Sequence, residues 1–273
     1  MTEPVAGVWL PKRAQVGTQV KASTTVGIIG PSGAGKSHLA RQLALDPEYA
    51  DQILVLASED STATYGADAM AHMAIAQVTT LDDAMSVVKE LIAARVKGER
   101  MPKAVVVDSM SGIADYMTVY YKDHASEFLD DKGKKNTYAK FDDLAVGFTE
   151  LFIKIRDGMK ADCVVLATTT PPPIPQLCIA GRVVPANFNR WTSCCFFLNV
   201  EKVEYDPAAQ TPSEKPYRTI ARDELGKPLG IILNRYITTM NSGEILAKGH
   251  RNLGFRELAV LPDLLRKIHG RVG

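Results

Sequence analysis

The stretch GIIGPSGAGKSHLA, residues 27–40, constrains the fold more than any other part of the sequence. It begins with an apolar run that fits a buried strand, continues through a glycine-rich turn, and ends in residues that fit a helix. Residues 30–37 match the pattern G-x-x-x-x-G-K-[ST] at every fixed position. A strand, such a turn and a helix in this order predict a phosphate-binding loop in an α/β domain.

The residue types in this loop suit the polyphosphate of a nucleotide. Small residues let successive backbone N–H groups curl around a phosphate, and the helix that begins there directs its positive end at the same anion. Lys36 can bring a positive charge to the outer phosphates, and the Ser37 hydroxyl can ligate Mg²⁺. We therefore expect ATP and Mg²⁺ as cofactors. The expected nucleotide contacts are Gly30, Pro31, Ser32, Gly33, Ala34, Gly35, Lys36, Ser37 and His38.

Buried strands alternate with helical patterns on both sides of this loop. The apolar runs expected to form strands are residues 26–29, 52–57, 103–110 and 163–169. The helical patterns cover residues 36–45, 68–76, 80–98, 111–122 and 138–159. The third of these has the clearest ends, since Thr80 can cap it and Gly98 can end it. Such alternation predicts parallel βαβ units over residues 25–170.

The pattern changes after residue 170. Residues 170–191 are rich in proline and predict irregular structure, and antiparallel strands joined by turns are expected to follow. Residues 254–269 fit a helix that Pro262 breaks or kinks. The fold class is thus α/β, with a mainly parallel sheet flanked by helices and an antiparallel C-terminal extension. The predicted divisions are an N-terminal arm (1–24), a nucleotide-binding core (25–240) and a tail with a short helix (241–273).

Two acidic residues are expected close to the phosphate loop. The carboxyl ends of parallel strands meet at one edge of a sheet, and Asp108 and Glu59 both follow apolar runs. Asp108 can hold Mg²⁺ from the side opposite the loop, or it can cap the helix that follows. Glu59 can orient or deprotonate the attacking water, and Asp60 is a rival candidate for this role. Alternatively, the two residues only form a solvated acidic loop.

Three threonines, residues 168–170, end the last strand of the expected parallel core. A hydroxyl or amide of Thr169 or Thr170 can sense the outermost phosphate and pass its state to the next loop. These hydroxyls can equally serve only to satisfy the backbone at the end of the strand.

The order of these elements resembles that of the RecA-like P-loop ATPases. More narrowly, it is similar to the core-only RecA-like proteins of bacteriophages, known as phage nucleotide-binding proteins and single-strand annealing ATPases. The resemblance covers roughly residues 26–240 and rests on the loop at 30–37, then Glu59, then Asp108 in this order.

The resemblance implies an ATPase that assembles into a ring or filament with nucleotide between subunits. In that family Lys36 and Ser37 match the loop lysine and hydroxyl, Asp108 the metal-side aspartate and Glu59 the catalytic glutamate. The family usually carries Gln or His where this chain has residues 168–170, which is a departure from its usual sensor.

The resemblance also implies a DNA partner and a charge supplied by a neighbouring subunit. The proline-rich stretch falls where RecA-like proteins place a DNA-contacting loop. Alternatively, it is a lid packed over its own domain, with Trp191 in the core. The residues expected to contact single-stranded DNA are Arg182, Phe188 and Arg190, because Arg holds phosphates and Phe stacks on bases. The candidates for the residue that reaches the neighbouring nucleotide are Arg218, Arg222, Lys248 and Arg251.

Several alternatives stay open at this level. A small-molecule or nucleotide kinase can carry the same loop, a viral DNA-packaging or translocating motor shares the broad fold, and a nucleotide-binding switch needs no turnover. The net charge of +1 gives no global attraction to nucleic acid or membrane, so any basic surface is local. No apolar run approaches a membrane span and the N-terminus does not fit a signal peptide, which favours the cytoplasm, or the host cytoplasm for a viral protein.

Overall fold

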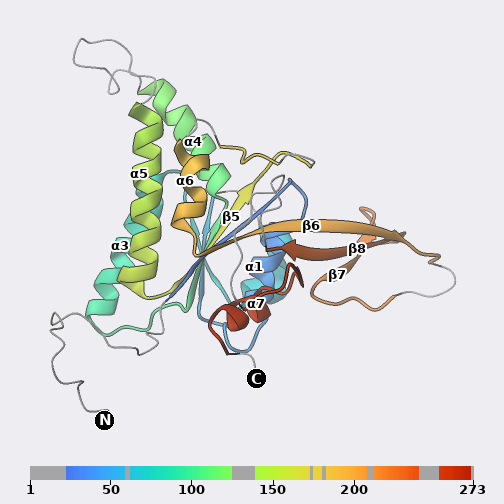
Figure 1. The fold of residues 1–273 in the computed structure, drawn as a ribbon. Coiled ribbons are helices and arrows are strands. Elements are labelled where there is room, and N and C mark those ends of the chain that lie inside the picture. The colour runs from blue at the N-terminus through green and yellow to red at the C-terminus, as the bar shows by residue number, and fades with distance from the viewer. Residues whose placement is uncertain are drawn as a thin grey trace, which may run out of the picture.

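A mixed sheet of nine strands forms the centre of the part of the chain that the structure describes (Figure 1). This computed structural model describes residues 23–58, 62–124, 139–172, 175–179, 183–207, 212–239 and 252–271. The strands are β1 (Thr25–Gly30), β2 (Ile53–Ala57), β3 (Ala74–Gln77), β4 (Ala104–Asp108), β5 (Asp162–Thr168), β6 (Cys194–Glu204), β7 (Arg218–Arg222), β8 (Pro228–Thr238) and β9 (Arg256–Leu258). The helices are α1 (Lys36–Ala44), α2 (Thr62–Met70), α3 (Leu81–Val96), α4 (Met110–Asp123), α5 (Ala139–Ile153), the π-helical η2 (Lys154–Met159), α6 (Val183–Trp191) and α7 (Leu261–Ile268).

The sheet joins a parallel half to an antiparallel half. Its strand order is β3-β2-β4-β5-β1-β6-β8-β7, with β9 paired to β8. The neighbours from β3 to β6 are parallel, whereas β8 is antiparallel to β6, β7 and β9. The predicted fold class, a mainly parallel sheet flanked by helices with an antiparallel extension, is confirmed. The strand β6 belongs to both halves, because it pairs with β1 on one side and β8 on the other.

Helices cover both faces of the parallel half, which explains why its strands read as continuous apolar runs. Along β5 the side chains alternate between the two faces: Val165 packs in the core beneath α3, α4, α5 and α6, and Val164 packs in the core beneath α1, α2 and α7. Figure 1 shows these two helix groups on either side of the sheet. The helix α3 is capped as expected, with the Thr80 hydroxyl accepting from the backbone N–H of Asp83.

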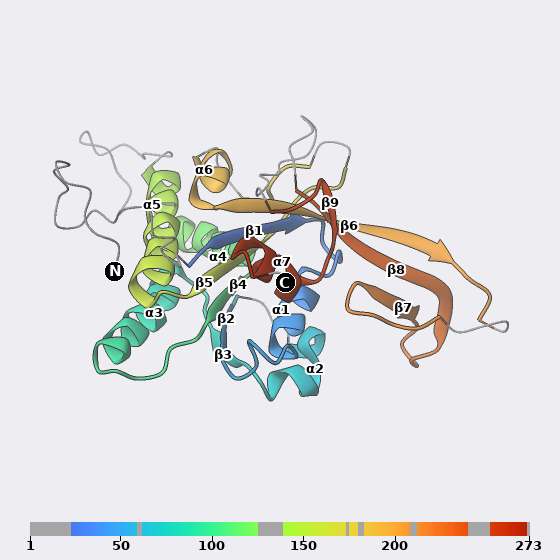
Figure 2. The same cartoon turned by 60° about the horizontal axis from the view of Figure 1, so that its bottom comes forward.

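The antiparallel half extends beyond the helices. The strand β6 is buried over its first five residues and exposed over its last four. Figures 1 and 2 show β6, β8 and β7 reaching away from the helical layers as a ribbon.

Two expectations about proline were wrong. Residues 183–191, expected to be irregular, form α6, because Pro185 falls in the first turn, where its missing N–H has no partner within the helix. Likewise Pro262 lies at the start of α7 and fits that position, so it begins the helix instead of breaking it.

One helix was also placed too late in the chain. A helix was expected at residues 68–76, but α2 ends at Met70 and residues 74–77 form the edge strand β3. The parallel pairing of β3 with β2 overrides the local preference of its alanines.

Candidate nucleotide site

The phosphate loop follows β1 and leads directly into α1, and glycines set its shape. Gly33 and Gly35 have φ of 74° and 93°, a backbone region that favours glycine. A Cβ at Gly33 would meet no heavy atom within 4 Å. A Cβ at Gly35 would lie 2.5 Å from the Nε atom of Arg235, so both the backbone and the packing require glycine there.

Lys36 lies at the opening of this loop. It is the first residue of α1, and its ammonium donates to the carbonyls of Gly30 and Pro31, each at 3.0 Å. Ser37 follows on the first turn of the helix and is half-buried. An ammonium, a hydroxyl and a helix N-terminus at a glycine cradle fit a polyphosphate with its Mg²⁺.

Asp108 ends β4, and a single strand, β5, separates it from β1. The register places Asp108 opposite Leu166 of β5 and Gly30 opposite Thr168, so both strands end within two residues of each other along β5. The Asp108 side chain is buried and accepts a hydrogen bond from the hydroxyl of Tyr65, which is itself buried. Its carboxylate is therefore held in a defined orientation at the edge of the sheet that carries the loop.

Asp108 is not the cap of the helix that follows it. The cap of α4 is Ser109, whose hydroxyl accepts from the backbone N–H of Gly112 at 3.0 Å. Capping of α4, the alternative role for the Asp108 carboxylate, is therefore excluded.

The end of β2 is tied to the same edge. The backbone N–H of Ser58 donates to the Asp108 carbonyl at 2.8 Å, and its hydroxyl donates to the Ser109 carbonyl at 3.0 Å. Glu59 and Asp60 lie outside the described residues. The role of Glu59 in activating water therefore stays a prediction. The residue before it, Ser58, lies beside Asp108.

Thr169 contacts the start of the phosphate loop. Its backbone N–H donates to the Gly30 carbonyl at 3.0 Å, and its hydroxyl is buried without a hydrogen-bond partner among the described residues. The hydroxyl of Thr170 instead accepts from the backbone N–H of Gln176 at 2.8 Å and closes a turn. Of the two candidate sensors, Thr169 is the one in contact with the loop.

Arg235 was not anticipated from the sequence. It lies on β8, is almost fully buried, and donates through Nε to the Ala34 carbonyl at 3.2 Å and through Nη1 to the Thr219 hydroxyl at 2.8 Å. Burial lowers the pKa of its guanidinium. The sequence does carry a signal, since a single Arg within the apolar stretch of β8 suggests a buried, hydrogen-bonded cation. Its hydrogen-bond partner could not be predicted, because that depends on the pairing of distant strands.

Comparison with known proteins agrees with this geometry. Residues 22–170, more than half of the chain, match the family described as the AAA domain. The chain belongs to this AAA domain family. The matched residues include the phosphate loop at 30–37 and Asp108.

Other comparisons give less. No curated protein matches the chain. Among solved structures, a prototypical ATPase from the type III secretion system of pathogenic bacteria is similar, with 13% identity, a TM-score of 0.46, and coverage of 65% of this chain. The AAA protein spans about half of that chain, 52% of its length.

Of the residues expected to contact DNA, the structure describes Phe188 and Arg190, and only Arg190 is exposed. Phe188 is fully buried, and a Cβ at Gly27 would lie 2.7 Å from its ring, so the expectation that Phe188 stacks on bases was wrong. Its apolar ring instead packs α6 onto β1. Arg190 is exposed and donates to the Asn187 side chain at 3.3 Å, while Arg182 lies outside the described residues.

His38 and two of the predicted trans-acting cations, Arg218 and Arg222, contact partners outside the phosphate loop. The His38 ring contacts the Pro216 carbonyl at 3.0 Å, and burial lowers its pKa. Arg218 donates to the Asn234 side chain at 3.0 Å, and Arg222 pairs with Glu214 at 3.6 Å. Lys248 and Arg251 lie outside the described residues.

No helix among the described residues is both long and apolar enough to cross a bilayer.

Proposed function

We propose that this AAA protein hydrolyses ATP with Mg²⁺ and uses the reaction to act on single-stranded DNA, in recombination or annealing of the bacteriophage type. The observation that supports coupling between ATP hydrolysis and DNA binding is the hydrogen bond from the Thr169 N–H to the Gly30 carbonyl. It joins the phosphate loop to the segment at 170–182 that leads into α6. A change in the loop on hydrolysis would therefore reach this segment through Thr169.

Within the site, each side chain has a distinct task. With nucleotide bound, Lys36 would exchange the carbonyls of Gly30 and Pro31 for the outer phosphates, and Ser37 and Asp108 would hold the metal. Bound Mg²⁺ supplies positive charge to the phosphates as the outermost bond breaks.

We assign water activation to Glu59, the residue after Ser58, because the Ser58 N–H donates to the Asp108 carbonyl. Because a carboxylate there accepts the proton of the attacking water, Glu59→Gln should abolish turnover while ATP still binds. Unchanged hydrolysis in that variant would exclude Glu59 and favour Asp60.

We further propose that Arg182 and Arg190 contact the DNA backbone and that the active form is a ring or filament. Two arginines give phosphate contacts without base readout, which suits binding that is independent of sequence. In such an assembly, Arg218, Arg222, Lys248 or Arg251 would reach the nucleotide of the adjacent subunit.

The test is ATP hydrolysis with and without single-stranded DNA, combined with the mass of the assembly in solution. Hydrolysis should rise when DNA is added, and Lys36→Ala should abolish it. The exposed Lys97→Ala, on the C-terminal end of α3, is the matched control and should behave as the wild type.

The DNA contacts are tested by Arg182→Ala combined with Arg190→Ala. This double variant should weaken DNA binding and flatten its dependence on salt, because two phosphate contacts are lost. Wild-type DNA binding would remove both residues from the proposal. A monomer that DNA does not stimulate, and that transfers phosphate to a small molecule, would point to a kinase.

A further inference from the structure

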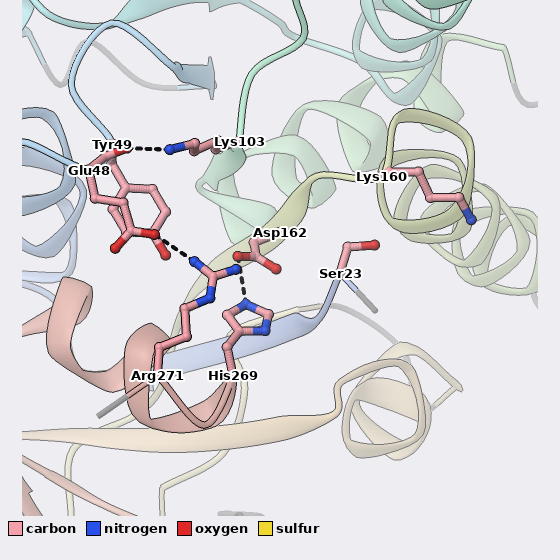
Figure 3. Close-up of a pocket in the computed structure, with 8 residues that line it drawn as sticks. All are labelled: Ser23, Glu48, Tyr49, Lys103, Lys160, Asp162, His269 and Arg271. Atoms are coloured by element: carbon pink, nitrogen blue, oxygen red, sulfur yellow. Dashed lines mark hydrogen bonds and ion pairs between the residues drawn. The ribbon is translucent and has the colours of Figure 1, made fainter. Parts of the chain in front are cut away.

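A second polar cavity lies at the opposite edge of the sheet from the phosphate loop. Its volume is about 320 Å³, and the residues that concern us are Glu48, Tyr49, Lys103, Asp162, His269 and Arg271 (Figure 3). Lys103 immediately precedes β4 and Asp162 begins β5, so the cavity is at the amino-terminal ends of these strands. The phosphate loop and Asp108 are at the carboxyl ends, which makes the two sites separate.

The carboxylates around this cavity are already satisfied. Asp162 accepts from the backbone N–H of Thr24 at 3.0 Å and pairs with His269 at 2.9 Å, one oxygen each. Glu48 accepts from Arg271 at 2.5 Å on one oxygen and from Arg266 at 3.2 Å on the other. Each of the four carboxylate oxygens therefore has a donor before any ligand enters.

Donors, in contrast, are left over. The Tyr49 side chain is almost fully buried, and its hydroxyl has no hydrogen-bond partner among the described residues. Burial, together with the nearby carboxylates of Asp162 and Glu48, raises the pKa of Tyr49, so the group stays a neutral O–H donor. A buried hydroxyl without a partner costs free energy, and a ligand oxygen that accepts its proton would remove that cost.

Basic side chains add to this surplus. The Lys103 ammonium uses one N–H on the Glu48 carbonyl at 2.9 Å and keeps two for other acceptors. Figure 3 shows Arg271 reaching across the cavity toward Glu48, while Lys160 points away from the other labelled side chains. Apart from Lys160, the lining has two basic residues, Lys103 and Arg271, and two carboxylates, Glu48 and Asp162, with His269 beside them.

We propose that this cavity binds a small oxyanion, a phosphate or carboxylate group, through the Tyr49 hydroxyl, the Lys103 ammonium and the Arg271 guanidinium. The three donors come from separate segments of the chain and line the same cavity. Cationic donors strengthen such bonds, since charge-assisted hydrogen bonds are roughly twice as strong as neutral ones. The proposal is independent of what the phosphate loop hydrolyses.

The experiment is calorimetric titration of the full chain carrying Lys36→Ala with inorganic phosphate, and separately with malonate, at constant ionic strength. Removing the loop lysine leaves the second cavity as the main anion site. Binding of phosphate alone assigns a phosphate ligand, and binding of malonate alone assigns a carboxylate. If neither anion binds, the proposal is overturned.

Tyr49→Phe in the same background removes one oxygen and should weaken anion binding by about tenfold, the effect of a lost hydrogen bond to a charged group. Without ligand this variant should unfold at the same or a higher temperature, because an unsatisfied buried hydroxyl is gone. Lys103→Gln should also weaken binding, whereas Lys97→Gln, at an exposed lysine that does not line the cavity, should not. Wild-type anion affinity in Tyr49→Phe would contradict the proposal.

Discussion

The close approach of Arg235 to Gly35 predicts how the phosphate loop responds to a single added methyl group. In Gly35→Ala the new Cβ would lie 2.5 Å from Nε, at a φ of 93°. The left-handed backbone costs about 1–2 kcal/mol for alanine. The guanidinium must also move away from the Ala34 carbonyl, which removes a charged hydrogen bond worth about 1.5–3 kcal/mol. We therefore expect a loss of about 3–4 kcal/mol in the free energy of unfolding.

Gly33→Ala is the matched control within the same loop. Its φ of 74° imposes a similar backbone cost, but its Cβ would meet no heavy atom within 4 Å. It should therefore lose only about 1–2 kcal/mol. The difference between the two variants, about 2 kcal/mol, measures the contact with Arg235.

The assay is urea unfolding of the nucleotide-free protein, with an unchanged slope as the sign that both variants unfold from the same state. A double-mutant cycle then isolates the contact, because Arg235→Ala removes the group that obstructs the Cβ. In that background Gly35→Ala should cost no more than Gly33→Ala. Equal costs for the two glycines in the wild-type background would refute the reasoning, as would an undiminished cost of Gly35→Ala beside Arg235→Ala.

Three further predictions follow from individual contacts. Tyr65→Phe removes the donor to Asp108 and should raise the Mg²⁺ concentration for half-maximal hydrolysis by about tenfold, so an unchanged Mg²⁺ dependence would contradict that role. Phe188→Ala should cost about 3–5 kcal/mol of stability in thermal or chemical unfolding, since the ring is fully buried. The pKa of Asp83 is lowered by hydrogen bonds from the Thr79 hydroxyl and nearby backbone N–H groups, so the stability it gives is present above its unfolded pKa and lost as pH falls through the folded pKa. Asp83→Asn should thus destabilise the protein at neutral pH and approach the wild type in acid, as measured by urea midpoints across pH.

The features that the sequence predicted correctly carry local signals. The phosphate loop is defined by fixed residues and by the strand and helix beside it, and continuous apolar runs revealed the parallel strands. The cap of α3 could be read from Thr80 and the acidic residues after it. In each case the physical cause lies within a few residues of the signal.

The features that the sequence missed depend on residues far apart in the chain. Proline suggested irregular structure near residue 185, yet the packing of Phe188 against β1 stabilises a helix there. Tyr65 contacts Asp108 across 43 positions, and Arg235 contacts Ala34 across 201. Neither contact can be derived before the strand order is known, because each requires a particular neighbour in space.

The position of Arg235 also explains why an antiparallel ribbon belongs to this nucleotide site. Its backbone N–H donates to the Tyr217 carbonyl at 2.7 Å, while its side chain connects the Thr219 hydroxyl to the Ala34 carbonyl of the loop. The strand β6 provides a second connection, since it pairs with β1 on one side and β8 on the other. The Arg235 guanidinium is buried, so water cannot easily replace the Ala34 carbonyl as its hydrogen-bond acceptor. Breaking this hydrogen bond therefore costs free energy when the loop changes shape. A loop that rearranges around phosphate must therefore move Arg235 or strain it, and either response is transmitted into β7 and β8.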